Sequence, residues 1–115
     1  ETLAALNCSN IICTTDAAEA VRDCTVVNTD TWISMGQESE KGTKEKAFFP
    51  YQVNAELLKL ATPDHVVMHC LPAYRGYEIT EDVLEGNAPV IFREAENRLH
   101  AQKAVLYTLA TTRQA

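Results

Sequence analysis

The sequence predicts an α/β fold: a parallel sheet with crossover helices, in a partial Rossmann-like, doubly wound arrangement. Three observations support this prediction. Short β-branched runs alternate with helical segments four times along the 115 residues, as in parallel sheets whose strands are joined by helices. The runs are apolar on both faces, as in strands covered by helices on both sides. The length is typical of a single folding unit.

Two strands and a helix are expected in the first part of the chain. Thr15 or Asp16 caps the helix, which has its acidic residues early and Arg22 late, as the helix dipole favours. The residues after the second strand are polar and lack any apolar period, so they predict a long loop. The expected elements are the end of a helix at 1–6, strand 11–14, helix 17–21, strand 24–29 and loop 30–46.

Two more strands and three helices are expected after the loop. Asn54 caps the first of these helices and Pro63 ends it, because proline does not continue a helix. Thr80 caps a short second helix, and the terminal helix carries an apolar stripe that includes Leu99 and Leu106. The expected elements are helix 55–61, strand 66–70, a short helix from residue 81, strand 89–92 and helix 94–110.

Composition excludes several classes of function. The net charge of −6 disfavours nucleic-acid binding, and no apolar run reaches the length of a membrane span. Four widely spaced glycines leave no dinucleotide-binding or P-loop motif. The four cysteines form no C-x-x-C pair, which favours a reducing compartment, so we expect a soluble, cytoplasmic protein. The chain starts at Glu1, inside a predicted helix, so we expect it to be part of a longer protein.

In parallel sheets, ligands gather beyond the carboxyl ends of the strands. Asp30 follows one predicted strand and stands before Trp32 and the Ser34-Met35-Gly36 segment. A carboxylate beside a loop of this kind suits an ammonium-bearing ligand, with Ser34 binding its polar groups and Gly36 letting the loop close. The alternative interpretation is an ordinary helix-capping aspartate with a surface tryptophan packed on it.

Cys70 and Leu71 end another predicted strand. Adjacent strand residues point to opposite faces, so His69 is not expected to act as a base for Cys70. Cys70 either lines a ligand pocket or is a core thiol. His65 and His69 lie ~13 Å apart along a strand, too far to share a metal ion, so no metal site is predicted. Arg75 is interpreted as a solvated charge.

Arg98 lies one turn into the terminal helix, near the carboxyl edge of the sheet. An arginine in this position can bind an anionic ligand or polarise a carbonyl group. The alternative is an Arg98–Glu94 ion pair at i, i+4, which contributes only a few tenths of a kcal/mol. Pattern alone favours the ion pair.

Together these segments resemble the C-terminal part of ornithine carbamoyltransferases. The resemblance rests on four motifs in the family's order, DTWISMGQE (30–38), PYQVN (50–54), HCLPAYRG (69–76) and EAENRLHAQKA (94–104). It implies transfer of the carbamoyl group of carbamoyl phosphate to L-ornithine, giving L-citrulline and phosphate, in arginine biosynthesis or the urea cycle. It also implies a homotrimer, or a larger assembly of trimers, and no metal or organic cofactor.

The resemblance also assigns residue roles. Asp30, Ser34, Met35 and Cys70 would bind ornithine, and the backbone carbonyl of Leu71 would bind the carbamoyl amide. Arg98 would contact carbamoyl phosphate and stabilise charge on the carbamoyl oxygen. Asp30, Cys70 and Arg98 are therefore the predicted catalytic residues. Asp30 beside Cys70 would help take a proton from the amine, and the departing phosphate is a further acceptor.

The sequence departs from the family in lacking its Ser-Thr-Arg-Thr-Arg phosphate-binding motif. We therefore expect residues 1–115 to be a single, partial ornithine-binding domain without the carbamoyl-phosphate domain, and inactive alone. Aspartate carbamoyltransferases have proline in place of Cys70, which argues against them. A putrescine or acetylornithine carbamoyltransferase, a non-catalytic binding or assembly module, and an unrelated flavodoxin-like domain are the competing interpretations.

Overall fold

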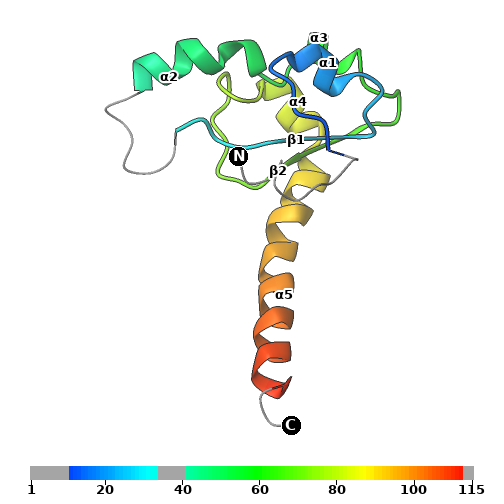
Figure 1. Ribbon diagram of the computed structural model, residues 1–115, viewed down its shortest axis with the longest axis vertical. Helices are drawn as coiled ribbons and strands as arrows, with labels where there is room; N and C mark the ends of the chain where they lie inside the picture. The colour runs from blue at the N-terminus through cyan, green and yellow to red at the C-terminus, as the bar shows by residue number, and fades with distance from the viewer. Residues whose placement is uncertain (1–10, 34–40, 113–115) are drawn as a thin grey trace.

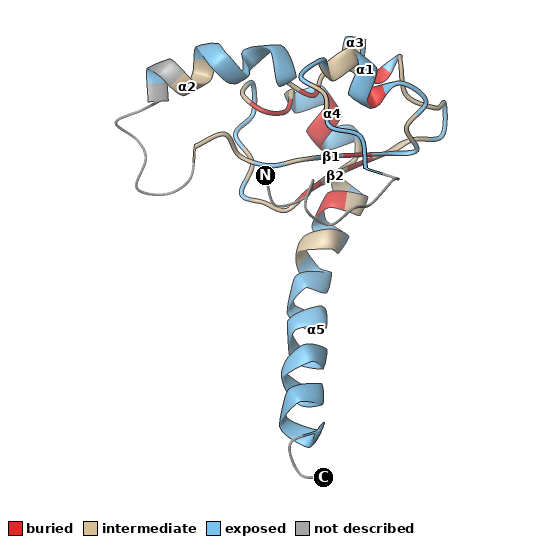
Figure 2. Cartoon of the chain, viewed as in Figure 1, coloured by how far each residue is buried: buried red, intermediate tan, exposed pale blue. Residues whose placement is uncertain are grey.

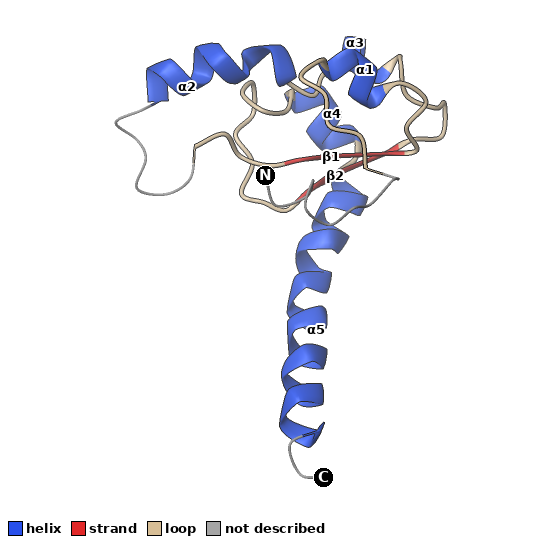
Figure 3. Ribbon diagram, viewed as in Figure 1, coloured by secondary structure: helices blue, strands red, loops and turns tan. Residues whose placement is uncertain are grey.

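The fold, a computed structural model that describes residues 11–33 and 41–112, is built on two parallel strands (Figure 1). The strands are β1 (Val26–Thr29) and β2 (Val66–His69). The helical segments are α1 (Ala17–Val21), α2 (Lys41–Phe48), the 3₁₀ turn η3 (Phe49–Tyr51), α3 (Ala55–Leu58), α4 (Glu81–Gly86) and α5 (Ala88–Thr112). The predicted α/β class with parallel strands is confirmed (Figure 3).

The register of the two strands determines which residues leave the sheet together. Val26 pairs with Val66 and Thr29 pairs with His69. Both strands run in the same direction, so the next residues, Asp30 and Cys70, leave the same edge of the sheet. The predicted strand ends therefore do come together at one edge.

The core lies between the strands and the helices α1, α3 and α4, which gather on one side of the sheet while α5 leaves from the other (Figures 1 and 2). Its members are aliphatic residues contributed by every one of these elements and by the segments around residues 53 and 79. They are Val21, Val27, Val53, Leu58, Val67, Ile79, Val83, Leu84 and Ile91.

Two predicted caps are present. Asp16 Oδ1 accepts hydrogen bonds from the backbone N–H groups of Ala18 and Glu19, at 2.8 and 3.2 Å. Asn54 Oδ1 accepts from the N–H of Leu57 at 2.9 Å. Each side chain satisfies donors that the first turn of a helix leaves unpaired.

The predicted strand at residues 11–14 is wrong, because these residues have no regular structure. Ile11 and Ile12 are exposed, Ile12 to 86%. A β-branched run becomes a strand only when another backbone edge is free to pair with it, and no described segment pairs with this one.

The predicted strand at 89–92 is also wrong, because these residues form the first turn of α5, which begins at Ala88 and not at Glu94. Pro89 lacks an N–H group, which costs nothing in the first turn of a helix. The carbonyl of Asn87 accepts from the N–H groups of Val90 and Ile91, at 3.0 and 3.1 Å. Ile91 is then fully buried against the sheet.

The predicted loop at 30–46 is shorter than expected, because α2 starts at Lys41. Its residues are mostly polar and give no apolar period, so the helical signal in this segment lies in propensity alone. The predicted helix at 55–61 is correct in place but regular only over Ala55–Leu58.

Helix α5 extends away from the body of the molecule (Figure 2). The radius of gyration is 17.0 Å, against about 13 Å for a compact domain of this length. Beyond its first turns the helix is exposed on all sides, with Leu106 67% exposed. Within residues 11–33 and 41–112, no helix combines the length and hydropathy needed to cross a membrane.

Candidate active site

Asp30 and Cys70 face each other beyond the carboxyl ends of β1 and β2. The Cys70 thiol donates a hydrogen bond to Asp30 Oδ1 at 3.0 Å. The same oxygen accepts from the N–H of Thr31 at 2.7 Å. Asp30 and Cys70, which the sequence places after two different strands, are therefore in direct contact.

The hydrogen bond between them separates their protonation states. The thiol lowers the pKa of Asp30 by donating to its ionised form, and the Thr31 N–H adds to this effect. The same bond raises the pKa of Cys70 from its ordinary 9.0 to about 11, with partial burial of the thiol as the second cause. At neutral pH the pair is therefore a carboxylate and a neutral thiol.

Arg98 shares a pocket with Cys70. The pocket has a volume of about 290 Å³ and lies between the end of β2 and one face of α5. It is lined by Cys70, Glu94, Ala95, Asn97, Arg98 and Ala101. Cys70 therefore contacts Asp30 and lines the same pocket as Arg98, although the three residues are far apart in the sequence.

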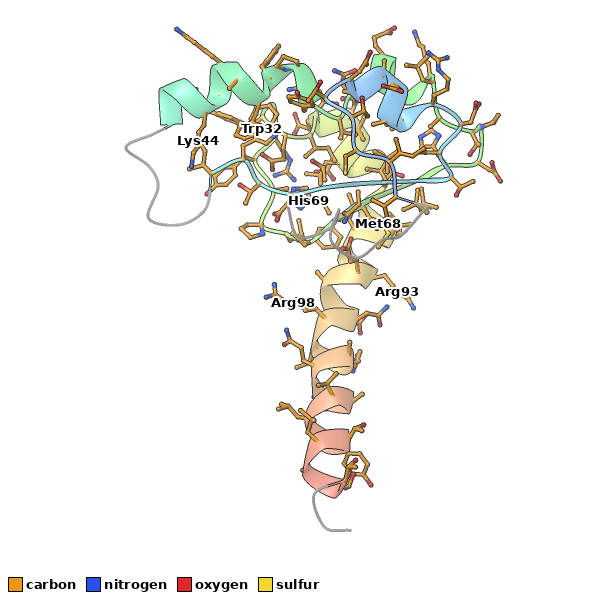
Figure 4. All side chains as sticks on the ribbon, viewed as in Figure 1. Trp32, Lys44, Met68, His69, Arg93 and Arg98 are labelled. Atoms are coloured by element: carbon orange, nitrogen blue, oxygen red, sulfur yellow. The ribbon has the colours of Figure 1, made fainter. Side chains whose placement is uncertain are left out.

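The alternative Arg98–Glu94 ion pair is absent from the described residues. Glu94 Oε2 instead accepts a hydrogen bond from the backbone N–H of His69 at 2.9 Å. No carboxylate in residues 11–33 or 41–112 pairs with Arg98. Figure 4 shows Arg98 and Arg93 leaving α5 on opposite sides. The guanidinium of Arg98 is therefore available to an anionic or carbonyl-bearing ligand.

Leu71 follows Cys70 in a conformation that leucine seldom adopts. Its φ is +53°, in the left-handed region, and its bond to Pro72 is cis. The N–H of Leu71 donates to His69 Nδ1 at 2.9 Å. This hydrogen bond and the positive φ turn the backbone sharply at the residue expected to offer its carbonyl group to the ligand.

His69 does not form a nucleophile–base pair with Cys70. Its ring is fully buried and contacts Glu78, with Nε2 3.2 Å from Glu78 Oε1, while the Cys70 thiol points to Asp30. Arg75 bonds Glu85 at 2.5 Å on the surface, as a solvated ion pair outside this site. The described residues contain no cluster of three or more His, Cys, Asp or Glu side chains able to hold a metal ion.

Two predicted ligand-binding residues, Ser34 and Met35, lie outside the described residues, as does Gly36. The segment before them is held by Trp32, whose ring centroid lies 6.2 Å from that of Phe48 and 6.4 Å from that of Tyr77. Phe48 is the last residue of α2, and Figure 4 shows Trp32 beside this helix.

Sequence analysis did not single out Asn97 or Glu78. Asn97 lines the pocket one residue before Arg98. Glu78 is fully buried and accepts from the N–H of Tyr74 at 2.6 Å as well as contacting His69. No local sequence signal marks Glu78 as buried, because its partners Tyr74 and His69 come together only in the fold.

The sequence of this chain is similar to those of known proteins. The family model described as aspartate/ornithine carbamoyltransferase, Asp/Orn binding domain, matches residues 1–109. The ornithine carbamoyltransferase of Akkermansia muciniphila is 69% identical over 108 residues, a match that covers 94% of this chain and 35% of that protein. The catabolic ornithine carbamoyltransferase of Thermoplasma volcanium is 56% identical over 101 residues, covering 88% and 33%.

The fold of this chain is also similar to that of a solved structure. The crystal structure of the anabolic ornithine carbamoyltransferase of Campylobacter jejuni has a TM-score of 0.80 and 47% identity, covering 84% of this chain and 32% of that one. The chain therefore spans about a third of the length of the relatives that it matches.

Proposed function

Because the chain belongs to the aspartate/ornithine carbamoyltransferase family, we propose that it supplies the ornithine side of a carbamoyl transfer site. The reaction moves the carbamoyl group of carbamoyl phosphate to the side-chain amine of L-ornithine, giving L-citrulline and phosphate. The observation that supports this proposal is that Cys70 donates a hydrogen bond to Asp30 and lines the same pocket as Arg98.

Asp30 binds the side-chain ammonium of ornithine in this proposal. Its carboxylate is ionised at neutral pH and lies at the site edge, so it attracts a cation. It is a poor final acceptor for the proton, because an alkylammonium keeps its proton up to a pKa of ~10.4, whereas the hydrogen bonds from Cys70 and Thr31 lower the pKa of the Asp30 carboxyl from its ordinary value. Asp30 therefore orients the nitrogen, and the departing phosphate takes the proton.

Cys70 acts as a neutral hydrogen-bond donor in the free site. With a pKa of about 11, its thiol keeps its proton at neutral pH and fixes the direction of the Asp30 carboxylate. A bound ammonium would enter beside both groups. Cys70 is therefore proposed to help place the nucleophilic nitrogen and not to act as a covalent nucleophile.

Arg98 stabilises the charge that develops as the bond to nitrogen forms. The neutral amine attacks the carbamoyl carbon, the new C–N bond forms, and the C–O bond to phosphate breaks with its electron pair leaving on phosphate. Negative charge grows on the carbamoyl oxygen, and a guanidinium aimed at that oxygen lowers the barrier. The backbone carbonyl of Leu71 accepts from the carbamoyl amide, and Ser34 and Met35 close over ornithine.

By itself, the chain is expected to bind L-ornithine without efficient turnover. Of the residues that line the pocket, Arg98 alone is a cation, and a single guanidinium is a weak clamp for a phosphate that carries almost two negative charges. The remaining phosphate contacts would come from sequence that the relatives have beyond this third.

Two assays test the function. The chain is titrated with L-ornithine, and it is mixed with carbamoyl phosphate and L-ornithine while citrulline is measured. In a second protein, this chain replaces the matching 35% of the Akkermansia muciniphila relative. We expect that hybrid to form citrulline, and Arg98→Gln to lower its kcat by about 100-fold or more. Asp64→Asn, a distant carboxylate change, is the control.

A hybrid that folds but forms no citrulline, together with a chain that binds no L-ornithine, would refute the proposal and favour the non-catalytic module. Carbamoylation of N-acetylornithine or putrescine in preference to L-ornithine would instead indicate one of the related transferases.

We also propose a cytoplasmic location, a homotrimer and a role in arginine biosynthesis. The described cysteines Cys13, Cys24 and Cys70 are free thiols, which suits the cytoplasm. A homotrimer and a role in arginine biosynthesis follow from the resemblance alone. Light scattering of the hybrid would measure the first, and the direction of flux in the source cells would measure the second.

A further inference from the structure

Two buried polar side chains lie directly behind the candidate site and have no part in the proposed chemistry. His69 and Glu78 are both fully buried. His69 Nε2 lies 3.2 Å from Glu78 Oε1, and the same oxygen accepts from the N–H of Tyr74 at 2.6 Å. Buried polar groups are costly unless they are satisfied, so an arrangement of this kind calls for a physical reason.

The hydrogen bonds define the tautomer of the His69 ring. The N–H of Leu71 points at Nδ1 from 2.9 Å, so Nδ1 is an acceptor and carries no proton. The ring proton is then on Nε2, where it is donated to the Glu78 carboxylate. His69 is thus a neutral bridge between a carboxylate and the backbone of Leu71, and a second ring proton would oppose the Leu71 N–H.

This bridge holds the segment that carries the site. Leu71 has a φ of +53°, which a leucine keeps only where surrounding contacts enforce it. Cys70 lies between the two bridged residues, so both of its peptide neighbours are fixed. The backbone N–H of His69 also binds Glu94 Oε2 at 2.9 Å, which keeps that carboxylate away from Arg98.

We propose that His69 is a positioning residue, which, held by Glu78, orients Cys70 and Leu71 toward the substrate through its Nδ1 atom. This inference rests on the proposed binding of L-ornithine at Asp30 and Cys70. It assigns no contact with substrate to His69 or Glu78. Their effect on binding passes through the Leu71 N–H.

Two substitutions at His69 separate this role from simple filling of the core. In His69→Asn, the side-chain oxygen can take the place of Nδ1 and accept from Leu71, while the contact with Glu78 is lost. In His69→Gln, the terminal amide can take the place of Nε2 and donate to Glu78, while the acceptor for Leu71 is lost. Glu78→Gln keeps an oxygen acceptor for both of its donors and removes the charge.

The experiment uses the chain itself, labelled with ¹⁵N, and L-ornithine as the probe. Long-range ¹H–¹⁵N spectra of the unliganded chain should show the His69 ring protonated on Nε2 and not on Nδ1. Titration with L-ornithine should give an unchanged Kd for His69→Asn and Glu78→Gln. His69→Gln should bind about tenfold more weakly or worse, as expected for loss of an orienting hydrogen bond. Melting temperatures of all four proteins are measured in parallel.

The outcomes separate the two proposals. If the wild-type chain binds L-ornithine and His69→Gln binds equally well, the positioning role is wrong and the proposed function stands. If both His69 variants lose affinity in proportion to their melting temperatures, His69 is only a core residue. A ring proton on Nδ1 also overturns the inference, whether or not the variants fold. If the wild-type chain does not bind L-ornithine, the proposed function fails first and this inference falls with it.

Discussion

Replacing Asp30 by asparagine should make the Cys70 thiol more reactive. The hydrogen bond to Asp30 is the largest cause of the raised pKa of Cys70, and the negative charge of Asp30 contributes as well. At a pKa of about 11, roughly one thiol in a thousand is ionised at pH 8. Asp30→Asn removes the charge and keeps the shape of the side chain.

The size of the effect can be worked from these values. Return of the pKa of Cys70 to 9.0 would raise its thiolate fraction at pH 8 about 100-fold. Intrinsic nucleophilicity falls with the pKa, so the rate of reaction with a disulfide rises less, by about tenfold. Burial of the thiol also raises the pKa and is unchanged by the substitution, so tenfold is an upper limit.

The assay follows modification by a small aromatic disulfide at pH 8, with each modified cysteine located by mass spectrometry. Exposed Cys13 is the internal standard, because its rate should not change. Asp64→Asn makes the same charge change in the turn before β2 and should leave Cys70 unaffected. A Cys70 rate in Asp30→Asn that equals or falls below that of the wild type would refute the electrostatic account of this pair.

Three further outcomes are expected from the packing, the caps and the thiol. Asn54→Ala should cost about 1 kcal/mol in urea unfolding, because it removes the acceptor for the N–H of Leu57. Ile91→Ala, at a fully buried position, should cost ~2–5 kcal/mol, whereas Leu106→Ala, 67% exposed, should stay within ~0.5 kcal/mol by the same measurement. The urea midpoint should fall as the pH rises from 9 to about 11, because the folded state raises the pKa of Cys70 and the unfolded chain releases that proton first; Cys70→Ser should lack this part of the loss.

The proximity of Asp30 and Cys70 could be predicted from the sequence because parallel strands align their carboxyl ends. Once residues 24–29 and 66–70 are taken as neighbouring strands, Asp30 and Cys70 become neighbours as well, and the structure places them in hydrogen-bond contact. The shared pocket of Cys70 and Arg98 depends on how α5 crosses this edge. The i, i+4 spacing favours an Arg98–Glu94 ion pair, because the sequence does not show that the backbone N–H of His69 donates a hydrogen bond to Glu94.

The errors have a common physical origin in tertiary context. Residues 11–14 and 89–92 have the same β-branched character as β1 and β2. The local sequence does not show which of these segments will lie beside another strand and pair with it. At Pro89 the decisive feature is the Asn87 carbonyl, which starts a helix there. The role of Glu78 was hidden because burial of a lone carboxylate is set by its partners, Tyr74 and His69, and not by its neighbours in sequence.

Helix α5 is attached to the rest of the molecule at its N-terminal end, so the direction of the helix determines where Arg98 lies in the pocket. Asn87 joins α4 to α5, and its side chain bonds the carbonyl of Val83 at 2.9 Å and the N–H of Val67 at 3.4 Å, so the joint is tied to β2. Arg98 stands ten residues beyond Ala88, or about 15 Å along the helix axis. A pivot of about 10° at the joint would therefore displace the guanidinium by about 2.6 Å relative to Cys70, nearly the length of a hydrogen bond. The angle between α5 and the sheet therefore determines whether one ligand can contact both Arg98 and Cys70.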